Sequence, residues 1–458
     1  MKKILITFTI VLTLVTSAAV QADTAYTYED AANEVYHALR ALDTFYFGDI
    51  DYKELADAAI ESIFEKLDRY TNYLTSEEFY VNFGEGQTRK TGIGVLMRTN
   101  LDEKAVVQEV FADSPAERAD IRPGDIIIRV DGEDVTGQSL EAIAALITGD
   151  EGTTVSVVVL RDNREAAFDV IRGTFWVPLV RRVPVSSLIS GADDNKTAYV
   201  ELTSFFTNPE NPAQDTGVQF GKILEDIKNE GINNLILDLR NNQGGHMQAF
   251  ADISQMLVKE GIICTLIDDR NNTVVYRSTN AEPDFNLAVL VNGGTASAAE
   301  ILAAAIKESG SGKLVGDTTY GKWVGQIIVP AYDDEHFLKI SASEFLTRDG
   351  NRLNGIGVTP DILIPDPPVI RFSVTDEQDE DEIRQLASAL YYLGYIANPD
   401  KDSLDTELQN ALTLFQKDAG LPESGTLTLE TARSINRFVA EKYLAFDEAI
   451  NAAYKLFD

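Results

Sequence analysis

Apolar strand-like runs alternate with helical segments between about residues 174 and 372, and this alternation constrains the fold more than any other feature of the sequence. Residues 198–202 and 234–239 are apolar enough to form buried strands, and residues 215–230 between them have helical spacing. Residues 287–291 form a further strand-like run, and a helix-like run follows from Ser297. Strands that alternate with helices predict an α/β core.

The chain is too long for one compact core, because single cores stop growing near 250 to 300 residues and this chain has 458. Its patterns predict a multidomain α/β protein. The expected parts are a signal peptide (1–22), an N-terminal helical region (23–85), a strand-rich domain with two helices (86–173), the α/β core (174–372), an acidic linker (373–382), a small three-helix domain (383–440) and a helical tail (441–458).

The first 22 residues have the pattern of a cleavable export signal. Lys2 and Lys3 supply the positive region, residues 4–15 are apolar, and residues 20–22 offer a small-residue cleavage site. An uncleaved anchor is the alternative, but the apolar run is short for a membrane span. We therefore expect export to the periplasm, the cell wall or the medium, and the sequence does not choose among these compartments.

Charge and cysteine content exclude several classes of function. The net charge of -34 argues against nucleic acid and against a polybasic membrane attachment, since both need clustered lysine and arginine. The single cysteine, Cys264, cannot form an internal disulfide and lies in an apolar run, so we expect a small core residue. No His-Glu-x-x-His or comparable ligand cluster is present, which predicts neither a metal site nor a cofactor.

The block from Gly92 to Gly173 carries an ordered set of strand, turn and helix markers. It opens with Gly92-Ile93-Gly94-Val95 and includes a helix-like run capped by Ser139. In this order the markers resemble a PDZ domain. The resemblance implies that backbone N–H groups of residues 92–95 bind the terminal carboxylate of a peptide that adds to the sheet as a further strand. The alternative is that the two glycines only form a tight turn.

Ser297 and Lys322 are the candidate nucleophile and base. A serine hydroxyl needs a base, and none of the three histidines (His37, His246 and His336) stands in a recognisable triad motif. A lysine can act as the base only when it is neutral, which requires a pocket that disfavours the ammonium. Ala298 follows the serine at the start of a predicted helix, so its N–H group is free to bind an oxyanion.

The segments around these residues, Asn292 to Glu300 and Thr319 to Gln326, resemble the catalytic segments of the carboxyl-terminal processing proteases. The resemblance implies that Gln326 orients the lysine amine and that Gly244 or Gly245, in the motif that starts at Asp238, completes the oxyanion hole. Two residues depart from the family pattern. Trp323 replaces a glycine and was expected to narrow the cleft or alter the position of Lys322, and His246 replaces an aliphatic residue.

Residues 383–440 resemble the three-helix peptidoglycan-binding domain of cell-wall proteins, which implies peptidoglycan as a partner. The alternative is a packing appendage with the same core pattern.

Taken together, the sequence predicts a secreted serine endopeptidase that recognises substrate C-termini and acts through an acyl-enzyme. Its expected partners are proteins or peptides with accessible C-termini, and the family also implies a homo-oligomer. The competing hypothesis is an inactive, wall-docked PDZ scaffold.

Overall fold

The computed structural model describes residues 26–99, 104–333, 335–371 and 380–457. The chain divides into two compact units, and the boundary along the sequence falls between Leu67 and Asp68. The export signal expected at 1–22 and most of the acidic linker expected at 373–382 lie outside the described residues. Within the described part of the chain, no helix is both long and apolar enough to cross a membrane.

The first unit contains the two helices expected near the N-terminus, α2 (Tyr28–Phe45) and α3 (Tyr52–Phe64). Thr27 and Asp51 begin them as N-caps, because their side chains accept hydrogen bonds from backbone N–H groups of the first turn. Neither helix has a buried residue. The oligomer that the family resemblance implies stays a prediction.

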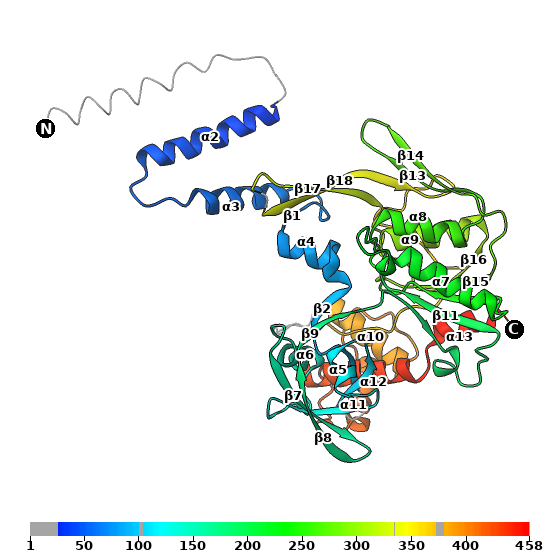
Figure 1. The fold of residues 1–458 in the computed structure, drawn as a ribbon. Helices are drawn as coiled ribbons and strands as arrows, with labels where there is room; N and C mark the ends of the chain where they lie inside the picture. Colours follow the sequence, from blue (N-terminus) through cyan, green and yellow to red (C-terminus); the bar gives the residue numbers. More distant parts are fainter. Residues whose placement is uncertain (1–25, 100–103, 334, 372–379, 458) are drawn as a thin grey trace, which may run out of the picture. The chain divides into compact units, whose positions relative to one another are not determined.

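A six-stranded sheet forms the core of the second unit (Figure 1). Its strands lie in the order β10, β11, β12, β15, β16 and β19. All neighbouring pairs are parallel except β10 and β11, as expected for a strand and helix alternation. Their bounds are Val180–Val183, Thr197–Leu202, Asn234–Asp238, Asn286–Val291, Gly312–Gly316 and Ile362–Leu363.

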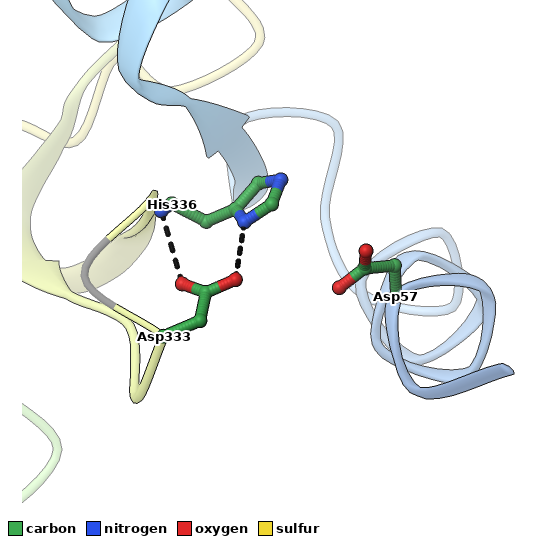
Figure 2. Close-up of side chains that lie close together, drawn as sticks. All are labelled: Asp57, Asp333 and His336. Atoms are coloured by element: carbon green, nitrogen blue, oxygen red, sulfur yellow. Dashed lines mark hydrogen bonds and ion pairs between the residues drawn. The ribbon is translucent and has the colours of Figure 1, made fainter. Parts of the chain in front are cut away.

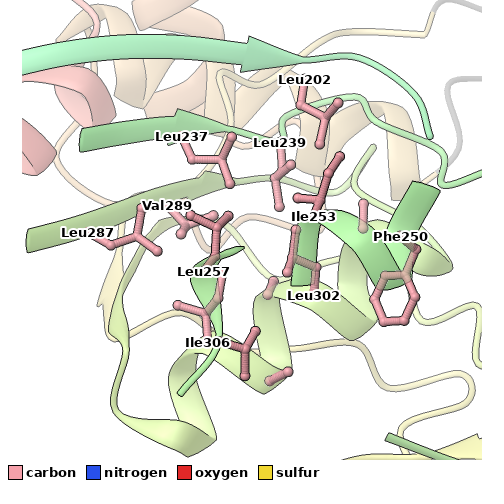
Figure 3. Packing of buried hydrophobic residues seen from close by; sticks show 14 of the residues in the cluster. Leu202, Leu237, Leu239, Phe250, Ile253, Leu257, Leu287, Val289, Leu302 and Ile306 are labelled. Atoms are coloured by element: carbon pink, nitrogen blue, oxygen red, sulfur yellow. The ribbon is translucent and has the colours of Figure 1, made fainter. Parts of the chain in front are cut away.

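Both faces of this sheet are buried, which explains why its strands read as continuous apolar runs. Leu237 and Val289 point to one face, where they pack with Leu302 of α9 (Figure 3). That face is covered by α7 (Thr216–Asn229), α8 (Met247–Leu257) and α9 (Ala298–Ser309). Residues on the opposite face pack against α13 (Glu448–Lys455). Cys264 is buried in the first of these cores, as expected, and burial raises the pKa of its thiol to about 12.

A second, five-stranded sheet lies beyond the core and contains a strand that the sequence analysis did not anticipate. This strand is β1 (Asn72–Thr75), which lies in the region expected to be helical and pairs with β18 (His336–Leu346). The partners are far apart in sequence, so no local pattern predicts the pairing. The other strands are β13 (Gly261–Ile267), β14 (Thr273–Ser278) and β17 (Val324–Pro330). Helix α4 (Ser76–Phe83) follows β1.

The strand-rich domain has the architecture that its markers predict. Its sheet has the order β3 (Val95–Thr99), β4 (Ala105–Val110), β5 (Ile126–Val130), β7 (Thr154–Arg161) and β8 (Arg164–Ile171), with β6 (Glu133–Asp134) paired to β5. Helix α5 (Pro115–Arg118) and helix α6 (Leu140–Ile147) complete it. Ser139 is the N-cap of α6, as predicted, since its hydroxyl accepts from the Ala142 N–H. Strands β2 (Arg89–Gly92) and β9 (Gly173–Trp176) pair where the chain enters and leaves this domain.

Three helices form the small C-terminal domain, namely α10 (Glu380–Leu393), α11 (Thr406–Asp418) and α12 (Leu429–Ala445). Their buried side chains form a separate hydrophobic cluster that includes Leu386, Leu412 and Ile435. The multidomain α/β architecture expected from the sequence is therefore confirmed.

Candidate active site

Two loops meet at the carboxyl ends of neighbouring parallel strands. Strands β12 and β15 are paired, with Asp238 opposite Leu290. Because parallel strands end at the same edge of a sheet, the loop 239–246 after β12 lies beside the loop 292–297 after β15. We call these segments the interlocked loops. The Thr295 hydroxyl donates to the Leu239 carbonyl at 2.8 Å and joins their first turns.

Asn241 and Asn292 bind each other across the interlocked loops. The backbone N–H of Asn241 donates to Oδ1 of Asn292 at 2.9 Å. In return, Nδ2 of Asn292 donates to Oδ1 of Asn241 at 3.1 Å. The two bonds hold the loops at a fixed separation. Asn241 therefore fixes the first loop against the second.

Asn242 is fully buried and holds the first loop from within. Its Nδ2 donates to the Leu202 carbonyl, and its Oδ1 accepts from the Gly244 N–H, both at 2.8 Å. Its backbone carbonyl accepts from the Ala296 N–H at 2.8 Å, next to Ser297. A buried amide whose groups are satisfied in this way gives the loop one defined conformation.

Ser297 occupies the N-cap position of α9 in an unusual backbone conformation, with φ 57° and ψ -123°. Non-glycine residues rarely adopt positive φ, and such strain costs on the order of 1–3 kcal/mol unless the surroundings over-determine it. Helix α9 behind it is buried from Ala298 to Ile306. The sharp turn places Ser297 where a parallel strand passes into a rigid helix.

Gly244 lies directly against the start of α9. Its φ is 96°, and a Cβ at this position would stand 2.9 Å from both Ala298 N and Ser297 Cβ, so only glycine fits. The Gly244 N–H is already bound to Asn242. The N–H groups of Ala298 and Gly245 have no acceptor among the described residues. Those two donors are therefore available to a ligand.

Glu300 joins the serine segment to the lysine segment. Its carboxylate is fully buried on α9. One oxygen, Oε2, accepts from the backbone N–H of Ser297 at 2.9 Å and from the backbone N–H of Lys322 at 2.8 Å. The other oxygen accepts from the Thr319 hydroxyl and from the Gly321 N–H. The two catalytic candidates, which are distant in sequence, are thus adjacent in space and share one acceptor atom.

The Lys322 amine lies in a site that disfavours its charge. Burial and, to a lesser extent, the like charge of Lys339 on β18 lower the pKa of Lys322, and Glu300 opposes the shift, so that the pKa is about 8. The Nζ atom stands 5.4 Å from the centroid of the Tyr70 ring. It forms no hydrogen bond with any described residue, so in this structure it contacts neither the Ser297 hydroxyl nor Gln326.

Gln326 is bound to the turn that precedes β1. Its Nε2 donates to the Tyr70 carbonyl at 2.6 Å. Strand β17 begins at Val324, so Lys322 lies before the strand. The alternation of side chains along β17 therefore does not determine where the Lys322 side chain points. The structure therefore brings Gln326 and Lys322 to the same residue, Tyr70, and not to each other.

The histidines of the second unit are held by other groups. His246 accepts from the Thr207 N–H at Nδ1, at 3.1 Å, so its Nε2 carries the proton and donates to the Phe83 carbonyl at 3.0 Å. The Nδ1 atom of His336 lies 2.6 Å from a carboxylate oxygen of Asp333 (Figure 2), and the ring stacks on Tyr73. The third histidine, His37, belongs to the N-terminal unit. The absence of a histidine-based triad motif in the sequence agrees with these contacts.

Trp323 lines no cleft, so the first of its two expected effects is wrong, while an effect on the position of Lys322 stays a prediction. Its side chain is fully buried and belongs to the main hydrophobic core. The backbone N–H of Trp323 donates to Oδ1 of Asn354, and its backbone carbonyl accepts from the Phe345 N–H. An indole is large enough to fill core volume, and that packing decided its orientation.

The carboxylate-binding candidate of the PDZ-like domain lies at a free sheet edge. Strand β3 ends the sheet, so its outer edge has no strand partner among the described residues. The Phe111 N–H donates to the Gly94 carbonyl, which makes Val95 and Val110 a non-hydrogen-bonded pair. The Val95 N–H therefore points to the free edge. Ile93 is buried in the domain core and offers only its backbone.

Comparisons with known proteins identify the domains of this chain. Residues 196–364 match the model of peptidase family S41. The core domain of this chain is therefore an S41-type peptidase domain. Residues 91–171 match the PDZ domain, and residues 379–435 match a peptidoglycan-binding domain. The sequence is 27% identical to a protein of Staphylococcus haemolyticus described as a CtpA-like serine protease, and the match covers 91% of this chain and 83% of that one.

Two solved structures are similar to parts of this chain. A protein of Bacteroides fragilis described as an S41 protease matches 70% of this chain and 84% of its own, with a TM-score of 0.50 and 16% identity, which shows a common fold. The photosystem II D1 C-terminal processing protease matches 73% of this chain and 88% of its own, at 27% identity and a TM-score of 0.42. The three family matches and the staphylococcal relative, taken together, show a serine protease with a PDZ domain and a peptidoglycan-binding-like domain.

Sequence reasoning missed Glu300, Asn242, Lys339 and Tyr70. A signal for Glu300 was present, because a serine followed by a glutamate three residues later is the spacing of a capping box. The other three act across long sequence distances, and no local spacing marks them.

Replacing Glu300 by glutamine tests whether it positions the site. The amide places an NH₂ group against backbone N–H donors, so we expect Ser297 and Lys322 to lose their shared acceptor. The kcat of the S41 protease should fall by about 100-fold. The matched control is Glu308→Gln at the exposed end of the same helix, where Glu308 accepts from the Asp349 N–H. Equal kcat values for the two variants would contradict the assignment.

Proposed function

We propose that this S41 protein is an exported serine endopeptidase in which Ser297 is the nucleophile and Lys322 is the general base. The observation that carries the proposal is the buried Glu300 carboxylate, which holds the backbones of both residues on one oxygen atom. The lowered pKa of the Lys322 amine supports it, since about 8 is near the pH at which a general base works.

In the proposed reaction the neutral Lys322 amine takes the proton of the Ser297 hydroxyl as that oxygen attacks the peptide carbonyl. The amine is unbound in this structure, so the step requires rotation of the lysine side chain toward the serine. Gln326 is the proposed orienting group. Its Nε2 is held by Tyr70, which leaves its Oε1 to accept from the amine.

We assign the oxyanion hole to the N–H groups of Ala298 and Gly245. Both lack an acceptor among the described residues, whereas the Gly244 N–H is bound to Asn242. Gly244 then has a steric role, because the absence of a side chain lets the loop lie close to the start of α9. Lys322 returns its proton to the leaving amine, and water hydrolyses the acyl-enzyme by the reverse path.

The PDZ domain is the proposed recognition site for substrate C-termini. The backbone of Gly92, Ile93, Gly94 and Val95 would bind the carboxylate. The free edge of β3 beside α6 would receive the peptide as an added strand. Gly94 cannot be enlarged, because a Cβ there would stand 2.4 Å from the Ser114 Cβ.

Peptidoglycan is the proposed second partner, which fits export. A groove of about 560 Å³ lies along α12 in the small C-terminal domain. It is lined by Arg433, Arg437 and Ser434, and the buried Ser434 hydroxyl has no hydrogen-bond partner among the described residues. Arg433 lines this groove together with Glu430, and Arg437 pairs with Glu441. The Arg433 guanidinium suits the carboxylates of peptide stems in a chain that is otherwise strongly acidic.

The protease assignment is tested with the purified protein and an unstructured polypeptide that ends in apolar residues. Ser297→Ala and Lys322→Ala should each abolish cleavage, while chelators should not change it. The same polypeptide with an amidated C-terminus should be cleaved more slowly, because the carboxylate contact is lost. Cleavage is measured by mass spectrometry of the products.

Retained cleavage in either alanine variant would show that the assigned roles are wrong. Binding of the polypeptide without any turnover by the unaltered protein would favour the inactive scaffold. Equal rates for the free and amidated substrates would remove the proposed role of the PDZ carboxylate site.

The rate should depend on pH through Lys322. Below about pH 8 the amine is mainly protonated and cannot accept a proton, so kcat/KM should rise with pH and level off above the pKa of about 8. Lys339→Gln removes a like charge, raises the pKa of Lys322 and should move the rise to higher pH. Lys339→Arg keeps the charge and is the control. A midpoint that is identical in all three proteins would contradict this origin of the pH dependence.

Retention on purified peptidoglycan tests the groove on α12. Arg433→Gln should weaken co-sedimentation several-fold, since it removes a charge-assisted contact to a carboxylate. The control is Arg384→Gln on α10 of the same domain, where the arginine pairs with Asp381 at the surface. If the two variants sediment equally well, the groove is not the docking site.

A further inference from the structure

Arg240 stands at the start of the first interlocked loop and is bound on every side. Its Nε and Nη2 donate to Asp238, and Nη2 also reaches the hydroxyl of Tyr199. Its Nη1 donates to the Tyr443 hydroxyl at 2.6 Å and to Oδ2 of Asp447 at 2.7 Å. These five residues form what we call the Arg240 network.

The network joins the protease core to residues beyond the peptidoglycan-binding-like domain. Tyr443 lies near the end of α12, and Asp447 is the N-cap of α13, where its Oδ1 accepts from the Ile450 N–H at 2.9 Å. Helix α13 is itself fixed, because Ala449, Ile450 and Ala453 are buried against the core sheet. The acceptors that hold Arg240 therefore belong to a rigid element.

The contacts in this network are strong because they are shielded from water. The side chains of Arg240, Asp238 and Asp447 are exposed by only 12%, 11% and 15%. The two carboxylates on one guanidinium raise the pKa of Arg240 above its already high ordinary value, against the effect of burial. Charge-assisted bonds in such surroundings are about twice as strong as neutral ones.

We propose that Asp447 and Tyr443 are positioning residues for proteolysis, which act through Arg240 on the loop that forms the oxyanion hole. The inference rests on the proposed function of Ser297 and Gly245. The chain of contacts is short. Arg240 precedes Asn241, which binds Asn292, and Asn242, which holds Gly244 beside Ser297.

The expected consequence concerns catalysis more than substrate binding. A displacement of about 1 Å in catalytic geometry can cost 100-fold in rate. The PDZ domain and its peptide site share no residue with the network. Loosening Arg240 should therefore lower kcat and leave KM nearly unchanged.

Asp447→Ser is the test variant, because serine still caps α13 but is too short to reach Arg240. Tyr443→Phe removes only the hydroxyl. The matched control is Asp405→Ser, which changes the N-cap of α11, where Asp405 accepts from the Leu408 N–H and pairs with Lys401 at the surface. Asp447→Asn retains the cap and an acceptor oxygen and should restore part of the activity.

Two readouts are measured on all variants of the full chain. The first is kcat and KM with the unstructured polypeptide, together with the inhibition constant of a peptide boronic acid that mimics the tetrahedral intermediate. Asp447→Ser should lower kcat by about tenfold to 100-fold and raise the inhibition constant of the boronic acid by a similar factor. Asp405→Ser should change neither.

The second readout does not need activity. Amide hydrogen exchange of residues 239–246, followed by mass spectrometry, should become faster in Asp447→Ser and Tyr443→Phe but not in Asp405→Ser. If the exchange rates of residues 239–246 are unchanged in Asp447→Ser and Tyr443→Phe, the inference is overturned, whatever the activity of these variants. Cleavage that survives Ser297→Ala would instead refute the proposed function and leave the exchange result to decide the role of the network.

Discussion

The buried carboxylate of Glu300 is the interaction on which the catalytic geometry depends. It accepts hydrogen bonds from the backbone N–H groups of both Ser297 and Lys322. A buried carboxylate is stable only when its oxygens are satisfied, and here backbone and hydroxyl donors satisfy them. The donors that satisfy this carboxylate therefore also hold the segment of the proposed nucleophile beside the segment of the proposed base.

Glu300 can act in this way because helix α9 is held rigidly in the core. The helix is buried along most of its length against a sheet whose two faces are both covered. Parallel pairing of β12 and β15 then places the glycine loop beside Ser297. The strained backbone of Ser297 is tolerated because these packed elements leave it no relaxed alternative. The S41 site is therefore a property of the whole core.

The same core receives contacts from segments that lie outside the PDZ and peptidoglycan-binding-like domains. Phe83, in the segment before the PDZ domain, accepts from His246 at the end of the glycine loop. Tyr70, near the start of the second unit, holds Gln326 and lies beside the Lys322 amine. Asp447, beyond the peptidoglycan-binding-like domain, holds Arg240. Segments on either side of the protease core thus bind residues within a few positions of the proposed machinery.

The sequence by itself determined the domain order, the α/β class and the candidate residues Ser297 and Lys322, because periodicity and motifs are local properties of a chain. It also predicted the cap at Ser139, which depends on neighbours three residues away. It could not predict β1, the buried place of Trp323 or the partner of Gln326. Those depend on pairings between segments far apart in the chain, and only the folded core decides which backbone groups and side chains meet there. The roles of Glu300 and Asp447 have the same origin, because a carboxylate finds its donors only after the sheet and its helices have packed.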